Sequence, residues 1–426
     1  MSAGAHATGV RRRVAFLEHA NVFEDFYPHY GVTQEQFAAI WHGSGNHALV
    51  RQIQQDIADV TWYEFSLQPT AADGIHGWTG SRVRFLKSPL LHRLLWRMFY
   101  LSPQAWRWRG YYRQFSTLAS YVGTLSFALF RALLRDQPHT IFCQDYATGR
   151  FDVLLVLARM MGLRIVAYHA GSTPAHYLGK GLRRLTLRHA DQLLVSSQRE
   201  LEWLVTEFKV PRERLQILLA PIDTEAFAPT EREAACAQAN LDPSRRYLLY
   251  VGRLEDRIKR VGLLLRTFAE VAAEHADVDL LIVGDGSDRA ALEGEAAASG
   301  PGRVHFLGWR SGAAALAPLY NAAECTVLIS RSEGFPMVVG ESMACGTPLI
   351  ATDVGGISEL VEHERTGWLI APESDDSVSA ALRTALTHAL TSPAVLTGMR
   401  SHARERAMAA VSRTSVVSQL RKALAP

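Results

Sequence analysis

The sequence predicts an α/β protein of two domains, each a parallel β-sheet covered by helices on both faces. The chain has 426 residues, which is long for one domain of ordinary size. Hydrophobic residues make up 48% of it and charged residues 20%, a balance that excludes a disordered or fibrous protein. Short apolar runs alternate along the chain with segments of helical length, as they do in doubly wound α/β proteins.

The first half of the chain contains five short apolar runs that predict buried strands. A run that is apolar at nearly every position indicates a strand of a parallel sheet, because helices cover both of its faces. The runs are Val14–Leu17, Val60–Phe65, Thr140–Cys143, Arg164–Tyr168 and Gln192–Ser196. The segment Phe151–Met161, between the third and fourth runs, has the length of a helix.

A second series of five runs follows in the other half of the chain. The runs are Tyr247–Val251, Asp279–Val283, Arg303–Phe306, Cys325–Ile329 and Pro348–Ala351. Between them, Val261–Glu274 and Asp288–Ala298 have helical length. Two such series indicate two doubly wound, Rossmann-like domains. The cleft between the carboxyl ends of their strands is where a ligand is expected.

Three prolines, Pro221, Pro229 and Pro243, interrupt a polar stretch between the two series and indicate the domain boundary. The predicted units are a first domain at residues 1–222, a second domain at 223–400, and a helical tail at 401–426 that packs back on the first domain.

Charge and cysteine content exclude several classes of protein. A formal net charge of +3 does not indicate a nucleic-acid binder. The four cysteines are far apart and form no Cys-x-x-Cys pair, which excludes a disulfide framework or zinc site and fits a reducing cytosol. The longest apolar segment, Tyr121–Leu134, is shorter than the roughly 20 residues that a spanning helix needs. We therefore expect a soluble, cytoplasmic protein.

One segment is strongly basic although the whole chain is nearly neutral. Residues 74–135 contain ten Lys and Arg residues and no Asp or Glu, and Trp and Tyr side chains lie between the cations. Within residues 82–113, this mixture is typical of a surface that docks on an anionic membrane, which would place the protein at the inner face of the membrane. Amphipathic helices that bury the aromatic side chains and expose Arg explain the same pattern, and the sequence leaves both interpretations open.

The second half also carries a pattern suited to phosphate and sugar binding. The segment Ser330–Glu341 passes from a predicted strand into a helix, and such a junction directs backbone N–H groups and the positive end of a helix at an anion. Its carboxylates, Glu333 and Glu341, are suited to accept hydrogen bonds from the paired hydroxyls of a sugar. Upstream, Arg253 and Lys259 follow another strand and have the charge to neutralise a diphosphate.

Together these motifs resemble family 4 retaining glycosyltransferases of the GT-B fold, over about Leu248 to Ala371. Glu333 and Glu341 have the Glu-x7-Glu spacing of that family. The other matching motifs are Gly252-Arg253-Leu254, Leu281-Ile282-Val283-Gly284-Asp285-Gly286, Phe306-Leu307-Gly308, Glu341-Ser342-Met343-Ala344-Cys345-Gly346-Thr347-Pro348, Val354-Gly355-Gly356-Ile357-Ser358-Glu359 and Thr366-Gly367-Trp368-Leu369-Ile370.

The resemblance implies a role for individual residues of the second half. Arg253 and Lys259 would bind the diphosphate of a nucleotide-sugar donor. Glu341 would bind the ribose hydroxyls, and Glu333 would act as a catalytic residue on the transferred sugar. Further donor contacts are implied for Gly284, Gly334, Phe335, Pro336, Met337 and Val338. No metal site is expected, and no cofactor besides the nucleotide sugar. We interpret Gly355, Gly356 and Glu359 as structural residues.

The first half resembles the family less closely. The segment Arg164-Ile165-Val166-Ala167-Tyr168-His169-Ala170-Gly171 is similar to the strand that ends in the family's active-site His, which implies a catalytic role for His169. Asp145 ends the preceding strand, where the family places acceptor contacts. Glu18-His19-Ala20-Asn21 follows the first strand in place of the family's Gly-Gly loop.

The function that the resemblance implies is retaining transfer of a sugar from a nucleotide-diphosphate sugar to a hydroxyl acceptor. The acceptor is expected to be a sugar or a lipid-linked sugar in polysaccharide or glycolipid biosynthesis. Three alternatives stay open: a sugar phosphorylase, a nucleotide-sugar epimerase, and a member of the family that binds sugars without catalysis. No nucleic-acid partner is expected.

Overall fold

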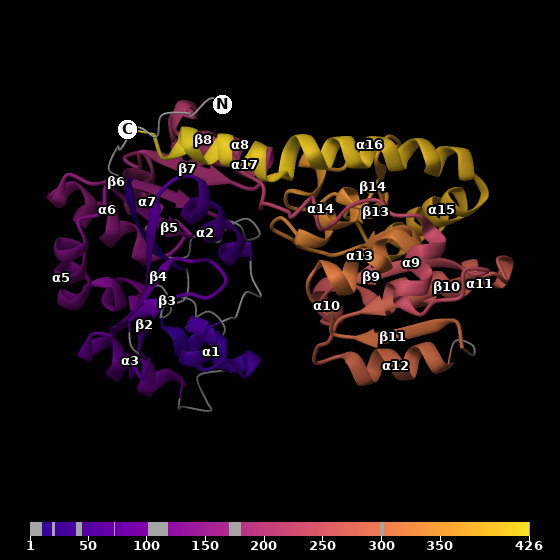
Figure 1. Ribbon diagram of the computed structural model, residues 1–426, viewed down its shortest axis with the longest axis horizontal. Helices are drawn as coiled ribbons and strands as arrows, with labels where there is room; N and C mark the ends of the chain where they lie inside the picture. Colours follow the sequence, from indigo (N-terminus) through magenta and orange to yellow (C-terminus); the bar gives the residue numbers. More distant parts are fainter. Residues whose placement is uncertain are drawn as a thin grey trace, which may run out of the picture.

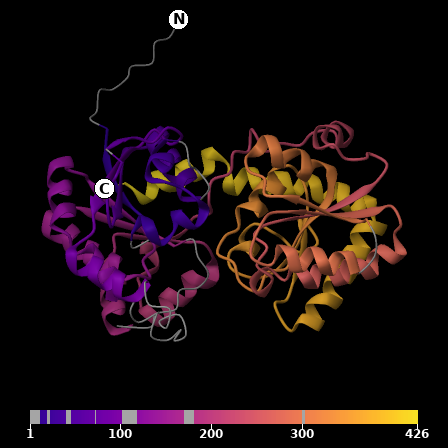
Figure 2. The same ribbon diagram turned by 90° about the horizontal axis from the view of Figure 1, so that it is seen from below.

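The computed structural model describes residues 11–18, 22–39, 45–71, 73–100, 118–169, 180–298 and 302–425. Two α/β domains lie side by side, and the helices at the end of the chain run across both of them (Figures 1 and 2). Each domain contains a largely parallel sheet, so the predicted fold class is confirmed. Each of the ten predicted apolar runs forms a strand, and four further strands complete the two sheets.

The first domain contains an eight-stranded sheet in the order β3-β4-β2-β1-β5-β6-β7-β8, parallel throughout except for β3. The strands are β1 Arg13–Leu17, β2 Asp59–Ser66, β3 Gly74–Ile75, β4 Arg82–Lys87, β5 Thr140–Gln144, β6 Arg164–Tyr168, β7 Gln192–Val195 and β8 Leu215–Ile217. The direction of the strand order reverses between the neighbours β1 and β5. Open α/β sheets bind ligands beyond the carboxyl ends of the strands at such a switch point.

Helices cover both faces of this sheet. They are α1 Gln34–Ala39, α2 Gly45–Asp56, α3 Leu90–Tyr100, α5 Phe127–Asp136, α6 Gly149–Met161, α7 Lys180–Leu187 and α8 Gln198–Phe208, with 3-10 helices at Phe23–Asp25, Tyr27–Tyr30 and Arg212–Arg214. The apolar sides of α5, α6 and α8 share one core with the sheet, whereas α1 and α2 pack in a second core on its other face.

The second domain contains a six-stranded, fully parallel sheet in the order β11-β10-β9-β12-β13-β14. The strands are β9 Arg246–Val251, β10 Val278–Val283, β11 Val304–Gly308, β12 Ala323–Leu328, β13 Leu349–Thr352 and β14 Gly367–Ile370. The first and fourth strands of this domain, β9 and β12, are neighbours, which is the arrangement of a dinucleotide-binding fold with its switch point between them.

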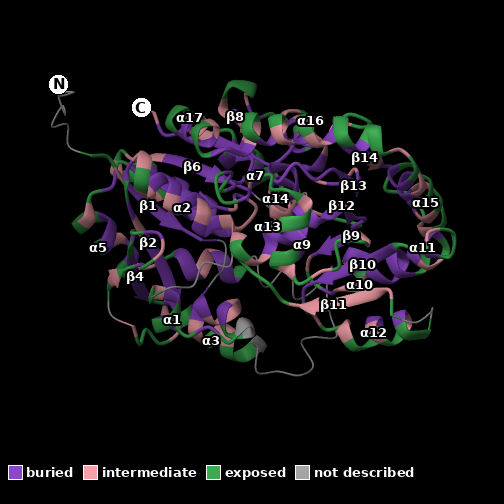
Figure 3. Cartoon of the chain, turned by 45° about the vertical axis from the view of Figure 1, so that its right-hand side comes forward, coloured by how far each residue is buried: buried purple, intermediate pink, exposed green. Residues whose placement is uncertain are grey.

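The helices of the second domain and the end of the chain are α9 Arg232–Ala239, α10 Asp256–Lys259, α11 Val261–Glu274, α12 Arg289–Ala298, α13 Ala313–Ala322, α14 Met337–Ala344, α15 Asp375–Thr391, α16 Pro393–Val411 and α17 Arg413–Ala423, with a 3-10 helix at Ile357–Glu359. Burial follows the layers: the inner strands are buried, the edge strand β11 is half-buried, and the outward faces of the helices are exposed (Figure 3).

The chain crosses between the domains twice, and the two crossings touch. The backbone N–H of Ile222 donates to the carbonyl oxygen of Val411, 2.9 Å away, at the end of α16. α16 packs in the core of the second domain, so the chain returns to the first domain only at Ser412, later than the boundary predicted at residue 401. From there α17 packs in the core of the first domain beside α2.

The basic segment is divided between core and surface. β4 lies inside the first sheet, between β2 and β3. Arg84 of β4 is buried and pairs with Asp73 and Asp136, the two acidic residues that flank the acid-free segment. Part of the predicted membrane-docking segment 82–113 is therefore core, whereas α3 lies at the surface. Residues 101–117 lie outside the described residues. Across the described residues, no helix is long and apolar enough to cross a membrane.

Candidate active site

The switch point of the second sheet brings together two loops that the sequence analysis singled out. One loop follows β9 and leads through Arg253 to α10, and the other, residues 330–337, follows β12 and leads into α14. We call residues 330–337 the donor loop. The backbone N–H of Arg331 donates to the carbonyl oxygen of Ile258, 2.8 Å away, and this hydrogen bond joins the two loops.

Lys259 and Glu333 form a buried ion pair between these loops. The Lys259 Nζ atom lies 2.5 Å from Oε1 of Glu333, and the two side chains are 11% and 9% exposed. The structure therefore brings together the residues for which diphosphate and sugar contacts are implied. A buried charge is stable only when it is paired, so each of these two side chains depends on the other at this position.

Glu341 lies one helical turn into α14 and is buried beside Tyr320 of α13. The Tyr320 hydroxyl donates to Oε2 of Glu341 over 2.9 Å. Burial raises the pKa of Glu341 to about 7, although the hydrogen bond from Tyr320 acts to lower it. The carboxylate therefore changes its charge near neutral pH. Tyr320 was not expected from the sequence, because a Tyr in an apolar helix resembles an ordinary core residue.

The donor loop leads directly into the N-terminus of α14. Pro336 is the N-cap residue, and no side chain forms a capping hydrogen bond there. The backbone N–H groups of Met337 and Val338 are thus at the positive end of the helix, the arrangement that binds phosphate in other proteins. Phe335 is 7% exposed and anchors the loop in the core of the second domain, next to Gly334.

Two glycines allow the loops to approach closely. A Cβ atom on Gly284, at the end of β10, would lie 1.8 Å from the carbonyl oxygen of Gly252, at the end of β9. Gly355 has a φ of +59°, and a Cβ atom there would lie 2.3 Å from the carbonyl oxygen of Glu333. Both positions therefore require glycine. For Gly355 this agrees with its interpretation as a structural residue.

Arg253 does not join the ion pair of Lys259 and Glu333 in this structure. Its side chain is 58% exposed and its Nη1 atom lies 2.6 Å from Oε1 of Glu255. Such an exposed pair contributes little to stability, so the guanidinium is easily released for another partner.

His169 follows β6 at the carboxyl edge of the first sheet and is 6% exposed. Its Nδ1 atom lies 2.6 Å from Oε1 of Glu200, near the start of α8. Burial acts to lower the pKa of His169, but the hydrogen bond and negative charge of Glu200, together with the charge of Asp145, raise it above the ordinary value. The hydroxyl of Tyr146 also donates to Glu200.

Asp145 directly follows β5, the neighbour of β6, and acts on His169 through its charge. Its backbone adopts a φ of +76°, and its Oδ1 atom accepts the backbone N–H of Ala147 over 2.6 Å. The backbone N–H of Asp145 donates to the carbonyl oxygen of Tyr168. The structure therefore places Asp145 and His169 at the same edge of the first sheet.

The two domains touch at the start of α8. The backbone N–H of Gln198 donates to Oε1 of Glu359 over 2.6 Å, and the Arg199 guanidinium donates to the carbonyl oxygen of Asp353 over 2.8 Å. The negative charge of Glu359 thus lies at the positive end of a helix in the other domain. A Ser-x-x-Glu pattern is visible in the sequence at the start of α8, but it does not show which domain lies beside it.

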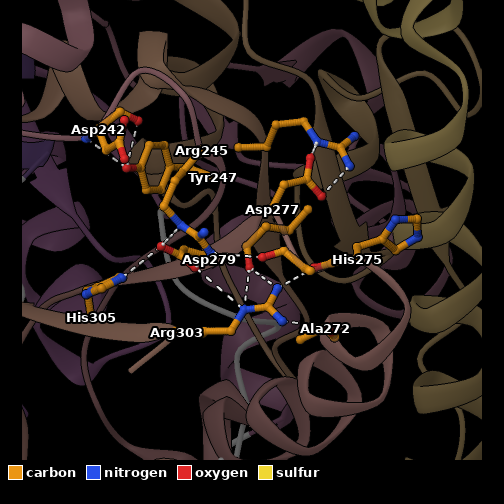
Figure 4. Close-up of polar contacts among 12 residues, drawn as sticks. Asp242, Arg245, Tyr247, Ala272, His275, Asp277, Asp279, Arg303 and His305 are labelled. Carbon is orange, nitrogen blue, oxygen red and sulfur yellow. Dashed lines mark hydrogen bonds and ion pairs between the residues drawn. The ribbon is translucent and has the colours of Figure 1, made fainter. Parts of the chain in front are cut away.

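The chain contains one Asp-x-Asp sequence, Asp277-Val278-Asp279, at the start of β10 and therefore at the amino ends of the strands of the second sheet. Figure 4 shows both carboxylates among the side chains that they contact. Asp279 is buried, and its carboxylate accepts hydrogen bonds from Arg245 and His305. Because these carboxylates lie at the amino ends of the strands and are paired with protein cations, they belong to the scaffold. No group of three or more potential metal ligands occurs among the described residues.

Comparisons with known proteins match both domains. A model described as Glycosyltransferase Family 4 matches residues 45–226, and one described as Glycosyl transferases group 1 matches residues 245–388. The D-inositol 3-phosphate glycosyltransferase of Mycobacterium sp. (strain KMS) is 32% identical over 217 residues, which cover 50% of this chain and 48% of the relative. That of Rhodococcus opacus is 30% identical over 274 residues, covering 61% and 59%. The chain thus matches about half the length of these relatives.

Solved structures match the whole architecture. Sucrose-phosphate synthase from Thermosynechococcus elongatus has a TM-score of 0.69 at 21% identity, covering 97% of this chain and 98% of the other. Anabaena HepE in complex with UDP has a TM-score of 0.68 at 16% identity, covering 97% and 99%. At these identities the likeness concerns the fold. With one family model on each domain and this common architecture, the chain belongs to the family 4 glycosyltransferases of GT-B type.

Proposed function

We propose that this protein is a retaining glycosyltransferase that moves a sugar from a nucleoside-diphosphate sugar to a hydroxyl group of an acceptor. One observation carries the proposal: the buried ion pair of Lys259 and Glu333 lies at the switch point of the second sheet, beside the uncapped start of α14. Charges of both signs at such a place suit a ligand that has an anionic group next to sugar hydroxyls.

The donor would be held by the second domain. Glu341 is suited to accept hydrogen bonds from the ribose hydroxyls, since an ionised carboxylate only accepts. Lys259 and the backbone N–H groups of Met337 and Val338 would bind the diphosphate, joined by Arg253 once it leaves Glu255. These positive groups, rather than a metal ion, would stabilise the diphosphate as it departs.

Retention would follow if the acceptor hydroxyl attacks the sugar on the face that the diphosphate leaves. Charge then develops on an oxocarbenium-like sugar, and no carboxylate nucleophile is needed. His169 would contact that sugar from the first domain, and Glu333 would bind its hydroxyls from the second. The first domain would then supply the acceptor site, with Asp145 beside His169 as one contact.

Solved structures of similar fold support a nucleotide-sugar donor, and the names of the curated relatives support glycosyl transfer. Two structures of Anabaena HepE are described as complexes with UDP and with UDP-glucose. The curated relatives carry the name D-inositol 3-phosphate glycosyltransferase.

Thermal unfolding in the presence of UDP, GDP, ADP, TDP and their sugars tests the donor site. A ligand at 100 times its Kd stabilises the native state by about 2.7 kcal/mol, so the matching nucleotide is expected to raise the Tm. Glu341→Ala is expected to abolish that shift, whereas Asp279→Asn, which changes a buried carboxylate at the far edge of the sheet, is expected to retain it. If no nucleotide shifts the wild type, the alternative of a sugar-binding protein without a donor is favoured.

A surface of the first domain favours a lipid-linked acceptor at an anionic membrane. Of the sixteen large hydrophobic side chains that are exposed across the described residues, twelve lie between Leu90 and Leu185. They lie on α3, α5, α6, α7 and the residues just before α5: Leu90, Leu91, Leu94, Met98, Leu118, Leu125, Phe127, Leu134, Val156, Met160, Leu182 and Leu185. The helices pack their inner sides in one core on the same face of the first sheet, so these side chains belong to one outer layer. An exposed apolar patch on such a layer marks a protein or membrane interaction site.

Arginines accompany these apolar side chains. The exposed residues include Arg97, Arg131, Arg135, Arg159, Arg184 and Arg188, and the described residues of the four helices contain no exposed Asp or Glu. Each cation near an anionic membrane contributes about 1 kcal/mol to binding. We therefore extend the predicted docking segment from residues 82–113 to these four helices, with β4 excluded because it is core.

Co-sedimentation with phosphatidylglycerol–phosphatidylcholine vesicles at low salt tests this surface. The wild type is expected to sediment with the vesicles, and Leu94→Glu combined with Met98→Glu is expected to weaken binding at least tenfold. Trp309→Glu is the matched control, because Trp309 is 68% exposed on the second domain. Equal sedimentation of all three proteins, or none, would leave the acceptor to be sought among soluble sugars.

A further inference from the structure

The carboxylate of Glu200 is fixed by three separate groups. Glu200 is 3% exposed and lies in the first turn of α8. The hydroxyl of the capping residue Ser197 accepts the backbone N–H of Glu200. Its Oε1 atom contacts Nδ1 of His169 and the hydroxyl of Tyr146, and its Oε2 atom accepts the backbone N–H of Ser196 over 3.3 Å. In a capping box, the carboxylate would accept the backbone N–H of Ser197; here Oε2 accepts that of Ser196, one residue earlier, and Oε1 points to the imidazole.

This contact determines how the imidazole is protonated. An ionised carboxylate has no hydrogen to donate, so the hydrogen of the 2.6 Å bond sits on Nδ1 of His169. Glu200 therefore contacts Nδ1, and the other ring nitrogen, Nε2, is left for another partner. Among the described residues, the charged and titratable groups that face the ring are Glu200 from α8, with Asp145 and Tyr146 from the turn after β5.

The same turn of α8 also contacts the second domain. Gln198 and Arg199, the two residues before Glu200, bind Glu359 and Asp353. The loop that carries those two carboxylates is hydrogen-bonded in turn to the donor loop, through the N–H of Gly356. The first turn of α8 therefore contacts both the imidazole of His169 and the second domain.

We propose that Glu200 is a positioning residue for His169: it holds the proton on Nδ1, leaves Nε2 for the donor sugar, and ties the imidazole to the helix end that contacts the second domain. The value of this arrangement to catalysis rests on the proposed function. The position of the proton does not, so it is tested separately.

Long-range 1H–15N spectra of protein labelled with 15N-histidine test the proton position. The His169 signals are identified by their loss in His169→Asn. In the wild type, Nδ1 is expected to be protonated across the neutral range, with a pKa above the ordinary histidine value. In Glu200→Gln, which keeps the shape of the side chain but removes its charge, the pKa is expected to fall by at least about 1. Glu202→Gln, an exposed site on the same helix, is the control and is expected to titrate as the wild type.

A wild-type His169 that carries its proton on Nε2 alone would overturn the proposal, even if Glu200→Gln fails to fold. So would a folded Glu200→Gln variant whose His169 titrates unchanged, because a merely structural Glu200 would lower the Tm without moving that pKa.

Kinetics with the nucleotide sugar found by thermal unfolding then test the catalytic consequence. Glu200→Gln is expected to lower kcat about tenfold or more and to shift its pH profile, with little change in donor KM, because the donor contacts lie in the second domain. An unchanged kcat would limit Glu200 to the architecture of the site. If no nucleotide binds, the proposed function fails and the proton position still stands or falls by the spectra.

Discussion

Burial makes a charge costly at the candidate donor site, and the residues there meet that cost in two different ways. Glu341 has one described hydrogen-bond donor, Tyr320, and no cation beside it, so its carboxylate is costly to ionise. Lys259 and Glu333 are also buried, but they form an ion pair with each other. These two solutions lead to different predictions for pH dependence and for mutation.

Nucleotide affinity is expected to depend on pH through Glu341. With a pKa of about 7, about a tenth of the carboxylate is ionised at pH 6, so affinity should be about tenfold weaker at pH 6 than at pH 8. Calorimetric titration across this range measures the effect. Tyr320→Phe removes a hydrogen bond that lowers the pKa, so it should move the loss of affinity to higher pH. A flat profile would show that Glu341 is ionised throughout.

Ionisation of Glu341 should have opposite effects on nucleotide affinity and on folding stability: it strengthens binding and destabilises the fold. The folded pKa of Glu341 lies above the unfolded value of 4.5, so its ionisation destabilises the native state progressively as pH rises from 4.5 through 7. Glu341→Gln should therefore unfold with a free energy up to about 3 kcal/mol higher than the wild type at pH 8, and nearly equal at pH 4. Urea denaturation at the two pH values measures this difference.

The contributions of Lys259 and Glu333 to the free energy of unfolding should be strongly coupled. Lys259→Met or Glu333→Gln alone leaves a buried charged or polar group without its partner and is expected to cost about 3 kcal/mol or more. The double variant should cost clearly less than the two single costs combined, and denaturant unfolding of all four proteins completes the cycle. Additive costs would mean that the two side chains do not interact in solution.

The structure brings Lys259 and Glu333 together because their motifs follow neighbouring strands of one parallel sheet. Their role in donor binding stays a prediction. Glu200 and Tyr320 were missed for a physical reason. Each acts through a neighbour that is distant in the sequence, Glu200 through His169 and Tyr320 through Glu341. A single sequence does not show such contacts.

At the scale of elements, short apolar strands were the most predictable feature, since parallel strands are buried on both faces. β4 was missed because its charged residues resemble a surface segment, and its buried Arg84 is explained only by Asp73 and Asp136 on either side. The contact between α8 and the loop after β13 was also unpredictable, because it joins elements of different domains.

The loop after β13 should be sensitive to a single methyl group. A Cβ atom on Gly356 would lie 2.3 Å from the backbone carbonyl oxygen of Ser196, in the other domain. Gly356→Ala is therefore expected to lower the Tm and to increase the radius of gyration measured by small-angle scattering. Gly294→Ala is the control, because Gly294 lies inside α12 with open space around it. There, alanine should stabilise the helix by up to about 1 kcal/mol.

On the scale of the whole molecule, α16 and α17 bind the domains together from outside the sheets (Figure 1). The composition of the tail predicts helices. It does not show where the chain returns, because the apolar positions of α16 and α17 are alike and only the tertiary structure assigns them to different cores.

Removal of residues 413–426 should destabilise the first domain alone. α17 contributes Val416 and Leu420 to the core that contains β1 and β2, and neither residue is exposed. Calorimetry is expected to show a first-domain transition at lower temperature, while the transition of the second domain still responds to the nucleotide. Deletion of only Ala425 and Pro426 should leave both transitions in place. A single transition shifted as a whole would mean that the domains unfold as one unit.

Retaining transfer from a nucleotide sugar is tested most directly by 1H NMR of the anomeric proton of the product. The protein is incubated with the nucleotide sugar that stabilises it, in the presence of simple sugar acceptors or water. An α-linked donor is expected to give an α-configured product with release of the nucleoside diphosphate, and Glu333→Gln is expected to lose the reaction. A β-configured product, or a sugar that leaves without release of the nucleoside diphosphate, would contradict retaining transfer.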